Sequence, residues 1–224
     1  MGFEPLLKDG RFYSILVRLL KLQEGFRLKA YRCKAGYLTI GVGHNLDQWA
    51  TAAEGAYFER YGAGEEQVYI WLAEDIKRAW EELEASFGEE TWWRGLSAPR
   101  RMLLIAMSFN LGMPKLRAFK KMFAAIGDGD YDRAAEEMLS SRWALQTEAA
   151  ARRLAQMMRS GSYPPELELD LKAKEGEGSY NYASLVGYLF HLLPASLLLF
   201  YSCHFFRLSL IAFLRNWRER RVLL

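Results

Sequence analysis

A carboxyl group, a thiol, a hydroxyl and an imidazole follow one another near the N-terminus, on Glu24, Cys33, Thr39 and His44. Hydrolysis of a glycosidic bond needs an acid that protonates the leaving oxygen, and a second group that stabilises the oxocarbenium-like centre or prepares a water. Glu24 can be the acid, since apolar neighbours such as Phe26 would favour its protonated form. Thr39 can orient a water. Glycoside hydrolysis is therefore one candidate chemistry for this stretch.

The same stretch allows a second chemistry. Cys33 and His44 could form the nucleophile and base of a wall-degrading amidase or peptidase. That alternative leaves Glu24 and Thr39 unused, and Cys33 does not begin a predicted helix, where a thiolate is best stabilised. Cys33 and His44 are also the only soft ligands in this region, so we expect no metal site and no cofactor.

Two predicted elements position these groups. Apolar residues recur at helical spacing over residues 12–22 and the pattern stops at Gly25, so Glu24 lies at the C-terminal end of a helix. Glycines punctuate a run of β-favouring residues between positions 31 and 43, which predicts a small hairpin or sheet carrying Thr39.

The rest of the chain predicts a helical domain. Residues 65–87 follow the pattern of one long amphipathic helix that Gly88 ends, and residues 45–64 form a mixed loop and short-helix region. Ser97 and Pro99 signal a helix start, and residues 102–111 are apolar nearly all round, as in a helix at the centre of a bundle. Further helices are predicted at residues 116–126, 131–139 and 147–158, before Gly161 and two prolines close the globular part.

Several separated motifs resemble, in order and spacing, the T4-type phage lysozymes of glycoside hydrolase family 24. They are Glu24-Gly25, Thr39-Ile40-Gly41-Val42-Gly43-His44, Phe109-Asn110-Leu111-Gly112, and Ser141-Arg142-Trp143 with Gln146. The likeness extends over about residues 15–164. It implies a two-lobed α+β, mostly helical T4-lysozyme-like fold: a small β-hairpin lobe, a long connecting helix, a helical C-terminal lobe and a cleft for substrate between them. It also implies cleavage of the β-1,4 bond between N-acetylmuramic acid and N-acetylglucosamine in peptidoglycan, for phage-type host cell lysis.

The resemblance assigns catalytic roles to three residues. Glu24 matches the general acid and Thr39 matches the strand threonine beside the reacting centre, while the family's usual aspartate falls on Cys33. Arg32 and Lys34 flank this cysteine, and nearby cations would favour the thiolate, which could act as nucleophile or electrostatic partner in the aspartate's place.

The resemblance also suggests substrate-binding residues. Phe109 and Asn110 would lie at the cleft floor, and Asn110 needs a hydrogen-bond partner, which could be sugar. His44 either contacts substrate or is a structural residue hydrogen-bonded at the base of the hairpin. The basic position that supports the family's catalytic glutamate falls on Ala150, which leaves Arg152 or Arg153 as substitutes. A further alternative is a wall-binding or phage structural module that lost activity when Cys33 replaced the carboxylate.

The charge and the cysteine content of the sequence limit which partners the protein can bind and in which compartment it is made. The formal net charge is +3, and basic residues cluster between positions 94 and 159 and again after 207, which favours an anionic polymer or surface. We expect peptidoglycan glycan strands as the partner and no nucleic acid. Two cysteines make no disulfide framework, and no secretory signal precedes the first helix, so we expect synthesis in the host cytoplasm and action on the cell wall.

We expect three segments: a lysozyme-like domain at residues 1–165, a linker at 166–180 and a hydrophobic tail at 181–224. Residues 182–206 contain no Asp, Glu, Lys or Arg and are long enough to cross a hydrocarbon core of roughly 30 Å. The arginines that follow predict a cytoplasmic C-terminal end if this segment inserts in a membrane. In that case either the tail directs export of the lysozyme-like domain, or the domain stays inside until a holin-like pore partner releases it. The alternative to insertion is that the tail packs on the domain.

Overall fold

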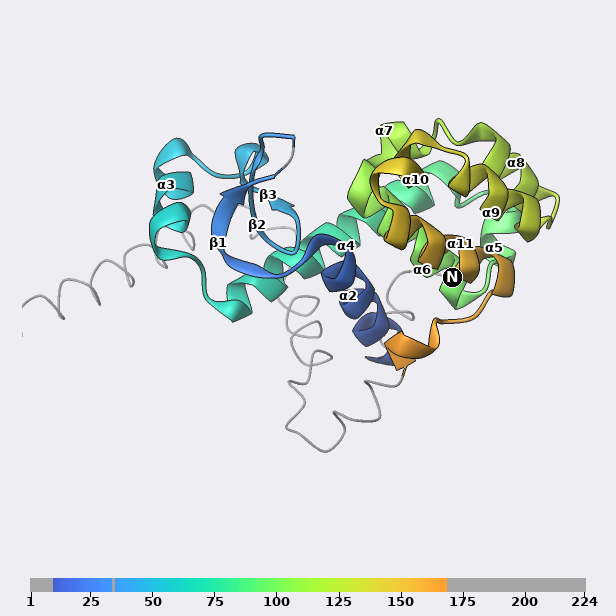
Figure 1. Ribbon diagram of the computed structural model, residues 1–224, viewed down its shortest axis with the longest axis horizontal. Helices are drawn as coiled ribbons and strands as arrows, with labels where there is room; N and C mark the ends of the chain where they lie inside the picture. The colour runs from blue at the N-terminus through green and yellow to red at the C-terminus, as the bar shows by residue number, and fades with distance from the viewer. Residues whose placement is uncertain (1–9, 34, 169–224) are drawn as a thin grey trace, which may run out of the picture. The chain divides into compact units, whose positions relative to one another are not determined.

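The computed structural model of the chain describes residues 10–33 and 35–168 (Figure 1). The order of elements begins with α2 (Gly10–Glu24), β1 (Arg27–Arg32), β2 (Leu38–Gly41), β3 (His44–Asn45) and the short 3-10 helix η1 (Leu46–Gln48). It continues with α3 (Ala52–Tyr61), α4 (Glu65–Phe87), α5 (Thr91–Gly95), α6 (Ala98–Leu111), α7 (Met113–Leu116), α8 (Lys120–Gly127), α9 (Tyr131–Leu139), α10 (Arg142–Gln146) and α11 (Glu148–Ser160). The described part is thus mostly helical with one small sheet, which confirms the predicted fold class.

The sheet is antiparallel in the order β1-β2-β3, and its register separates two kinds of side chain. Ile40 pairs with His44, whereas Thr39 pairs with Tyr31 on one side and with Asn45 on the other. Because successive side chains of a strand point to opposite faces, Ile40 and His44 share one face and Thr39 and Tyr31 share the other.

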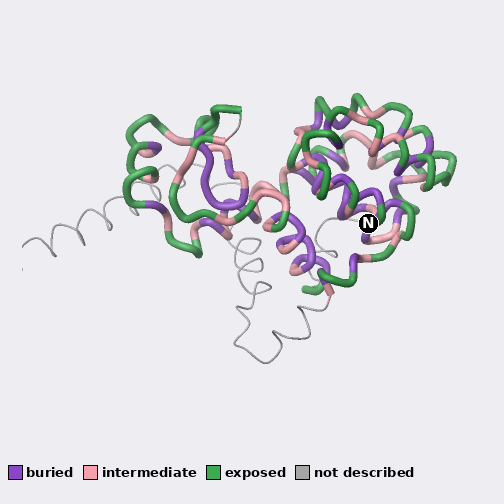
Figure 2. Tube along the Cα trace, viewed as in Figure 1, coloured by how far each residue is buried: buried purple, intermediate pink, exposed green. Residues whose placement is uncertain are grey.

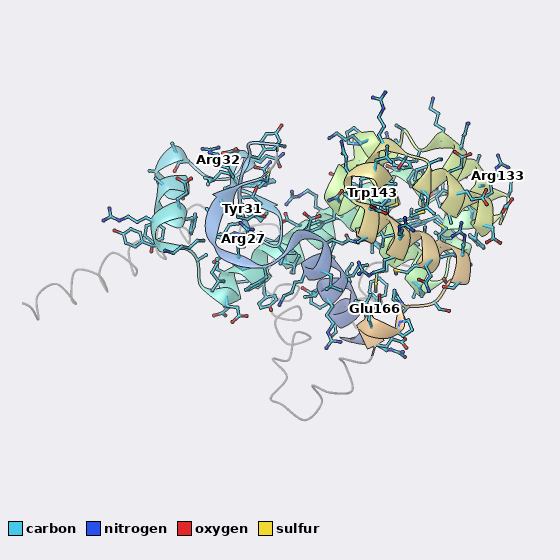
Figure 3. All side chains as sticks on the ribbon, viewed as in Figure 1. Arg27, Tyr31, Arg32, Arg133, Trp143 and Glu166 are labelled. Atoms are coloured by element: carbon cyan, nitrogen blue, oxygen red, sulfur yellow. The ribbon has the colours of Figure 1, made fainter. Side chains whose placement is uncertain are left out.

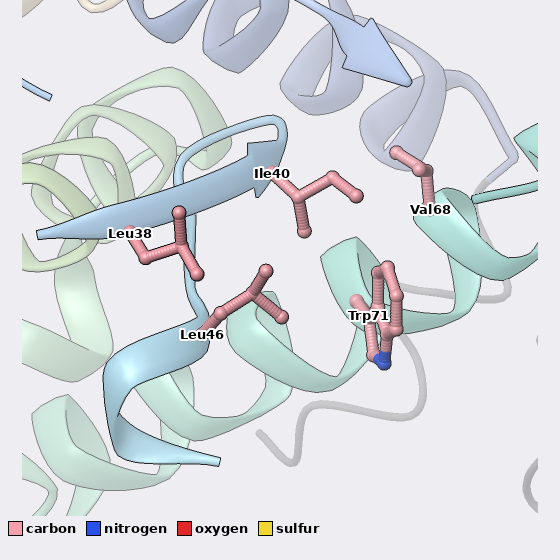
Figure 4. Close-up of a cluster of buried hydrophobic side chains, with 5 residues drawn as sticks. All are labelled: Leu38, Ile40, Leu46, Val68 and Trp71. Carbon is pink, nitrogen blue, oxygen red and sulfur yellow. The ribbon is translucent and has the colours of Figure 1, made fainter. Parts of the chain in front are cut away.

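The face of Ile40 is apolar and packs on α4. Leu38, Ile40 and Leu46 form a buried cluster with Val68 and Trp71, two residues of the first half of α4 (Figure 4). Burying such side chains contributes about 1.5–3 kcal/mol each. This cluster fixes the sheet on the helix and leaves the face of Thr39 for other uses.

Helix α4 has the predicted bounds, with Gly88 at its C-cap. Its second half belongs to a different core: Leu83 is fully buried, and the rings of Trp80 and Trp93 of α5 lie with their centroids 5.5 Å apart. One helix therefore takes part both in the core under the sheet and in the core of the helices that follow.

Helix α6 is the central helix of that second core, as its apolar sequence predicts. The side chains from Met102 to Met107 are 0 % exposed (Figure 2). Ser97 stands at the N-cap but makes no capping bond; its hydroxyl donates instead to the carbonyl of Gly161 at 3.3 Å. The start of α6 is thereby tied to the end of α11.

The short helices α5 and α10 were not predicted, and two helices, α7 and α8, are found where a single helix was predicted. Helices α5 and α10 have five residues each, too few to show a helical period. The helix predicted at 116–126 is broken at residues 117–119 into α7 and α8. Gly112 and Pro114 begin α7 before the predicted start.

The described part ends in a helical turn that contacts α2. Residues 165–168 are helical, Arg11 forms an ion pair with Glu168, and Arg18 donates to the carbonyl of Leu167 at 3.1 Å. The rest of the predicted linker and the whole predicted tail lie outside the described residues. Within residues 10–33 and 35–168, none of the helices has both the length and the apolarity of a membrane span.

Candidate active site

Glu24, the last residue of α2, is held by a residue from the end of α6. The side-chain Nδ2 of Asn110 donates to Oε1 of Glu24 at 2.7 Å. Asn110 is itself held by α10, because Nε1 of Trp143 donates to its Oδ1 at 2.9 Å. A chain of two hydrogen bonds therefore runs from a buried tryptophan to the carboxyl group.

These two hydrogen bonds determine how the amide of Asn110 and the carboxyl group of Glu24 are oriented. An indole N–H can only donate, so the oxygen of the Asn110 amide must face Trp143 and its nitrogen must face Glu24. The nitrogen is a donor, so Oε1 of Glu24 must accept. Oε2 is the carboxyl oxygen left to carry a proton.

The turn between β2 and β3 approaches the same carboxyl group. Gly43 has a φ of +76°, and a Cβ atom there would lie 3.4 Å from Cγ and 3.5 Å from Oε2 of Glu24, and 3.4 Å from Cε1 of Phe109. A residue without a side chain suits this position both for its backbone and for its neighbours. The structure thus brings Phe109, Asn110 and Gly43 together around Glu24.

Cys33 and Thr39 form the second half of the candidate site. Cys33 is partly exposed just after β1, and its backbone N–H donates to the carbonyl of Tyr37 at 2.9 Å. Thr39 is buried, and its hydroxyl donates to the same carbonyl at 3.0 Å.

The sulfur of Cys33 lies in an environment that favours the thiolate. Desolvation raises the pKa of the thiol, but hydrogen bonds to the sulfur outweigh it, so the pKa lies below its ordinary value. The backbone of Ala35, Tyr37 and Gly36 supplies these hydrogen bonds, and the Thr39 hydroxyl adds one when its proton turns from the Tyr37 carbonyl to the sulfur. The cation expected to do this, Arg32, donates instead to the carbonyl of Gly36 at 2.9 Å, and Lys34 lies outside the described residues.

Tyr31 joins the two halves and was missed by the sequence analysis. It pairs with Thr39 across the sheet, and the guanidinium of Arg27 lies 4.3 Å from its ring centre (Figure 3). Burial raises the pKa of its phenol; Arg27 lowers it, and the negative charges of Glu24 and Cys33 raise it further. Tyr31 is therefore within electrostatic reach of both the carboxyl and the thiol.

His44 lies on the opposite face of the sheet. Its ring is buried, stacks on Trp71 with centroids 5.1 Å apart, and bonds through Nδ1 to Oδ2 of Asp75 at 2.8 Å. Arg78 holds the other oxygen of Asp75 at 2.7 Å. The imidazole is thus tied to α4 and is turned away from the face that carries Thr39, so the structure does not form the Cys33–His44 dyad.

The two arginines considered as supports for Glu24 have other partners. Arg152 pairs with Glu148 at 2.8 Å and Arg153 with Glu166 at 3.3 Å. Among the described residues no cluster of His, Cys, Asp and Glu could hold a metal ion.

Comparison with known proteins identifies the arrangement. The family model described as phage lysozyme matches residues 21–159, a span that holds Glu24, Cys33, Thr39, Asn110 and Trp143. The chain belongs to the phage lysozyme family. This phage lysozyme is a glycoside hydrolase that acts on peptidoglycan.

Its relatives include two probable T4-type lysozymes and a pre-baseplate central spike protein. It is 27% identical over 163 residues to "Probable T4-type lysozyme 1" of Dictyostelium discoideum, covering 66% of this chain and 96% of that protein. It is 26% identical to "Probable T4-type lysozyme 2" of the same organism, with the same coverage. It is 24% identical over 160 residues to "Pre-baseplate central spike protein Gp5" of Enterobacteria phage T4, covering 66% of this chain and 28% of that protein.

Proposed function

We propose that this phage lysozyme cleaves the β-1,4 bond between N-acetylmuramic acid and N-acetylglucosamine, with Glu24 as the general acid. The observation that carries the proposal is the hydrogen-bond chain from Trp143 through Asn110 to Oε1 of Glu24. It holds the carboxyl group in one orientation and leaves Oε2 to protonate the leaving glycosidic oxygen. A general acid must lie within hydrogen-bond reach of that oxygen in a fixed geometry, and a carboxyl held at one atom meets this need.

Cys33 and Thr39 act on the other reacting atoms. As the glycosidic bond breaks, positive charge develops on the sugar ring, and the thiolate of Cys33 stabilises it in the place of the usual carboxylate. The Thr39 hydroxyl, held near the carbonyl of Tyr37, turns its oxygen lone pairs to an incoming water and orients it. The water adds to the anomeric carbon and gives a proton to the thiolate of Cys33, while the leaving sugar keeps the proton from Glu24; exchange with solvent then returns the proton from Cys33 to Glu24.

Phe109 and His44 have supporting parts in this proposal. Phe109 lies close to Gly43, as Glu24 does, and limits the access of water to the acid. His44 is hydrogen-bonded to Asp75 of α4 and so holds the turn with Gly43 against that helix. It positions the site from the face of the sheet opposite to Thr39. The cleft implied by the family resemblance and a direct contact of Asn110 with sugar stay predictions.

The product of the reaction tests the proposal. Purified peptidoglycan treated with the full chain should gain new reducing sugar ends and no new amino groups. The variant Glu24→Gln should produce none, whereas Glu59→Gln, which removes an exposed carboxylate from α3, should act like the natural protein. New amino groups would indicate an amidase or peptidase, and binding without either product would indicate a wall-binding module.

We also propose that the chain is made in the host cytoplasm, acts on the wall during host lysis and is held at a membrane by residues 182–206. The support is the absence of charged residues from this segment and the arginines that follow it. The double variant Leu198→Arg and Leu199→Arg should move the full chain from the membrane fraction to the soluble fraction. An unchanged distribution would contradict the anchor and would leave the muramidase proposal intact.

A further inference from the structure

About a quarter of the described sequence has an unbalanced charge. From Thr91 to Gly127 the chain contains no Asp or Glu but seven basic residues: Arg94, Arg100, Arg101, Lys115, Arg117, Lys120 and Lys121. The first three have structural partners. Arg94 pairs with Glu89, Arg100 donates to the carbonyls of Met158 and Arg159, and Arg101 is buried with its Nη2 on the carbonyl of Arg94.

The other four form a surface, which we call the cationic segment: Lys115, Arg117, Lys120 and Lys121 on α7, α8 and the turn between them. All four side chains are exposed, and within the described part of the chain none of them has a carboxylate partner. Arg117 is oriented by a hydrogen bond from its Nη2 to Oγ of Ser86 at 2.7 Å. Four like charges without counter-charges produce a local positive potential that attracts anions.

The cationic segment adjoins the candidate active site. Phe119 lies inside it, and its ring meets the ring of Trp143 edge-on with centroids 6.3 Å apart. Trp143 begins the hydrogen-bond chain to Glu24. Arg142, the residue before Trp143, is also exposed and has no ion pair among the described residues. The cationic segment is therefore linked to the carboxyl group of Glu24 through Phe119, Trp143 and Asn110.

We propose that the cationic segment binds the free carboxylates of the peptide stems on the glycan strand, and that it makes the enzyme selective for peptidoglycan whose stems are not amidated. This inference rests on the proposed muramidase function. The stems are joined to muramic acid, one of the two sugars at the scissile bond, so their carboxylates are the anionic groups that lie nearest a strand bound at Glu24. Lysine suits them, because its ammonium is a point charge on a flexible stem and can follow a mobile carboxylate.

The test compares two substrates and two charge-matched variants. The substrates are peptidoglycan with free stem carboxylates and the same material amidated with carbodiimide and ammonia. The first variant is Lys115→Gln, Lys120→Gln and Lys121→Gln together. The control is Arg60→Gln, Arg133→Gln and Arg152→Gln together, which removes three exposed positive charges elsewhere. Thermal unfolding of each variant shows that the domain stays folded.

Amidation should raise the KM of the natural protein about tenfold with little effect on kcat, since several exposed charge contacts, each weak in water, would be lost together. The lysine variant should show the same KM on both substrates and a weaker dependence of KM on salt, whereas the control should still discriminate. Equal KM values of the natural protein on both substrates, or equal losses in the two variants, would overturn the inference. Failure of the proposed function would look different, because no new reducing ends would form on either substrate.

Discussion

Asn110 donates its side-chain N–H to Oε1 of Glu24 and so joins the ends of α6 and α2 at the proposed catalytic acid. Replacing Asn110 by Ala removes the donor and lets the carboxyl group rotate. We expect kcat on peptidoglycan to fall about 10- to 100-fold, as misplacement of a reacting group typically costs. Trp143→Phe keeps the ring but removes the N–H that orients the amide, so a smaller loss is expected. A loss in Trp143→Phe as large as in Asn110→Ala would contradict this order.

Gly43→Ala should impair activity beyond its effect on stability. The added Cβ would press on Glu24 and Phe109, and the positive φ of +76° costs a residue with a side chain about 1–2 kcal/mol. Gly129 has a similar φ of +74° and nothing within 4 Å of an added Cβ, so Gly129→Ala is a matched control. Both variants should lose similar stability in denaturant unfolding, and only Gly43→Ala should lose kcat. Full activity of Gly43→Ala would show that the turn does not restrain the acid.

The thiol of Cys33 should react as a thiolate at a lower pH than an ordinary cysteine. Its pKa is lowered in the folded protein, so the thiolate forms earlier as pH rises and disappears only when pH falls through the lowered value. The rate of iodoacetamide alkylation in a Cys203→Ser background should therefore reach half its maximum below the pH seen in urea-unfolded protein. Thr39→Val removes one hydrogen bond to the sulfur and should move this midpoint upward. Identical midpoints for folded and unfolded protein would exclude the stabilised thiolate.

Substitutions at Cys33 separate its charge from its nucleophilicity. Cys33→Asp supplies a carboxylate at the same position and should keep activity on peptidoglycan. Cys33→Ser supplies no negative charge, so turnover should slow, with kcat affected more than KM. Activity of Cys33→Ser equal to that of the natural protein would make this residue a bystander.

His44→Phe should lower stability more than it lowers activity. The substitution keeps a ring on Trp71 but leaves Oδ2 of Asp75 without its partner in a largely buried position, while Arg78 still binds Oδ1. Losing a hydrogen bond to a charged group costs about 1.5–3 kcal/mol, which chemical denaturation can measure. Turnover per folded molecule at low temperature should change little. A large loss of kcat with unchanged stability would instead indicate contact between His44 and substrate.

The placement of single catalytic groups could be predicted from the sequence. Glu24 ends a helix because the apolar period stops at Gly25, and Thr39 lies on a strand because glycines bound a β-favouring run; both follow from patterns within a few residues. The bounds of α4 are given by a long amphipathic period and a terminal glycine.

The relations between these groups could not be predicted in the same way. Asn110 and Glu24 are 86 positions apart, and no local pattern encodes a contact at that distance. The face of the sheet on which the His44 ring lies depends on strand register. A shift of one residue would turn the ring from Trp71 to the face of Thr39. Tyr31 was missed for the same reason, because only its pairing with Thr39 brings it to the site.

The amide of Asn110 occupies one of the two oxygens of Glu24, so proton transfer has a direction. The glycosidic oxygen has to arrive at Oε2, the atom that faces Gly43, and this restricts which lone pair of that oxygen is protonated. In the proposed reaction, the hydrogen bond from Asn110 thereby restricts the side from which the acid can reach the glycosidic oxygen.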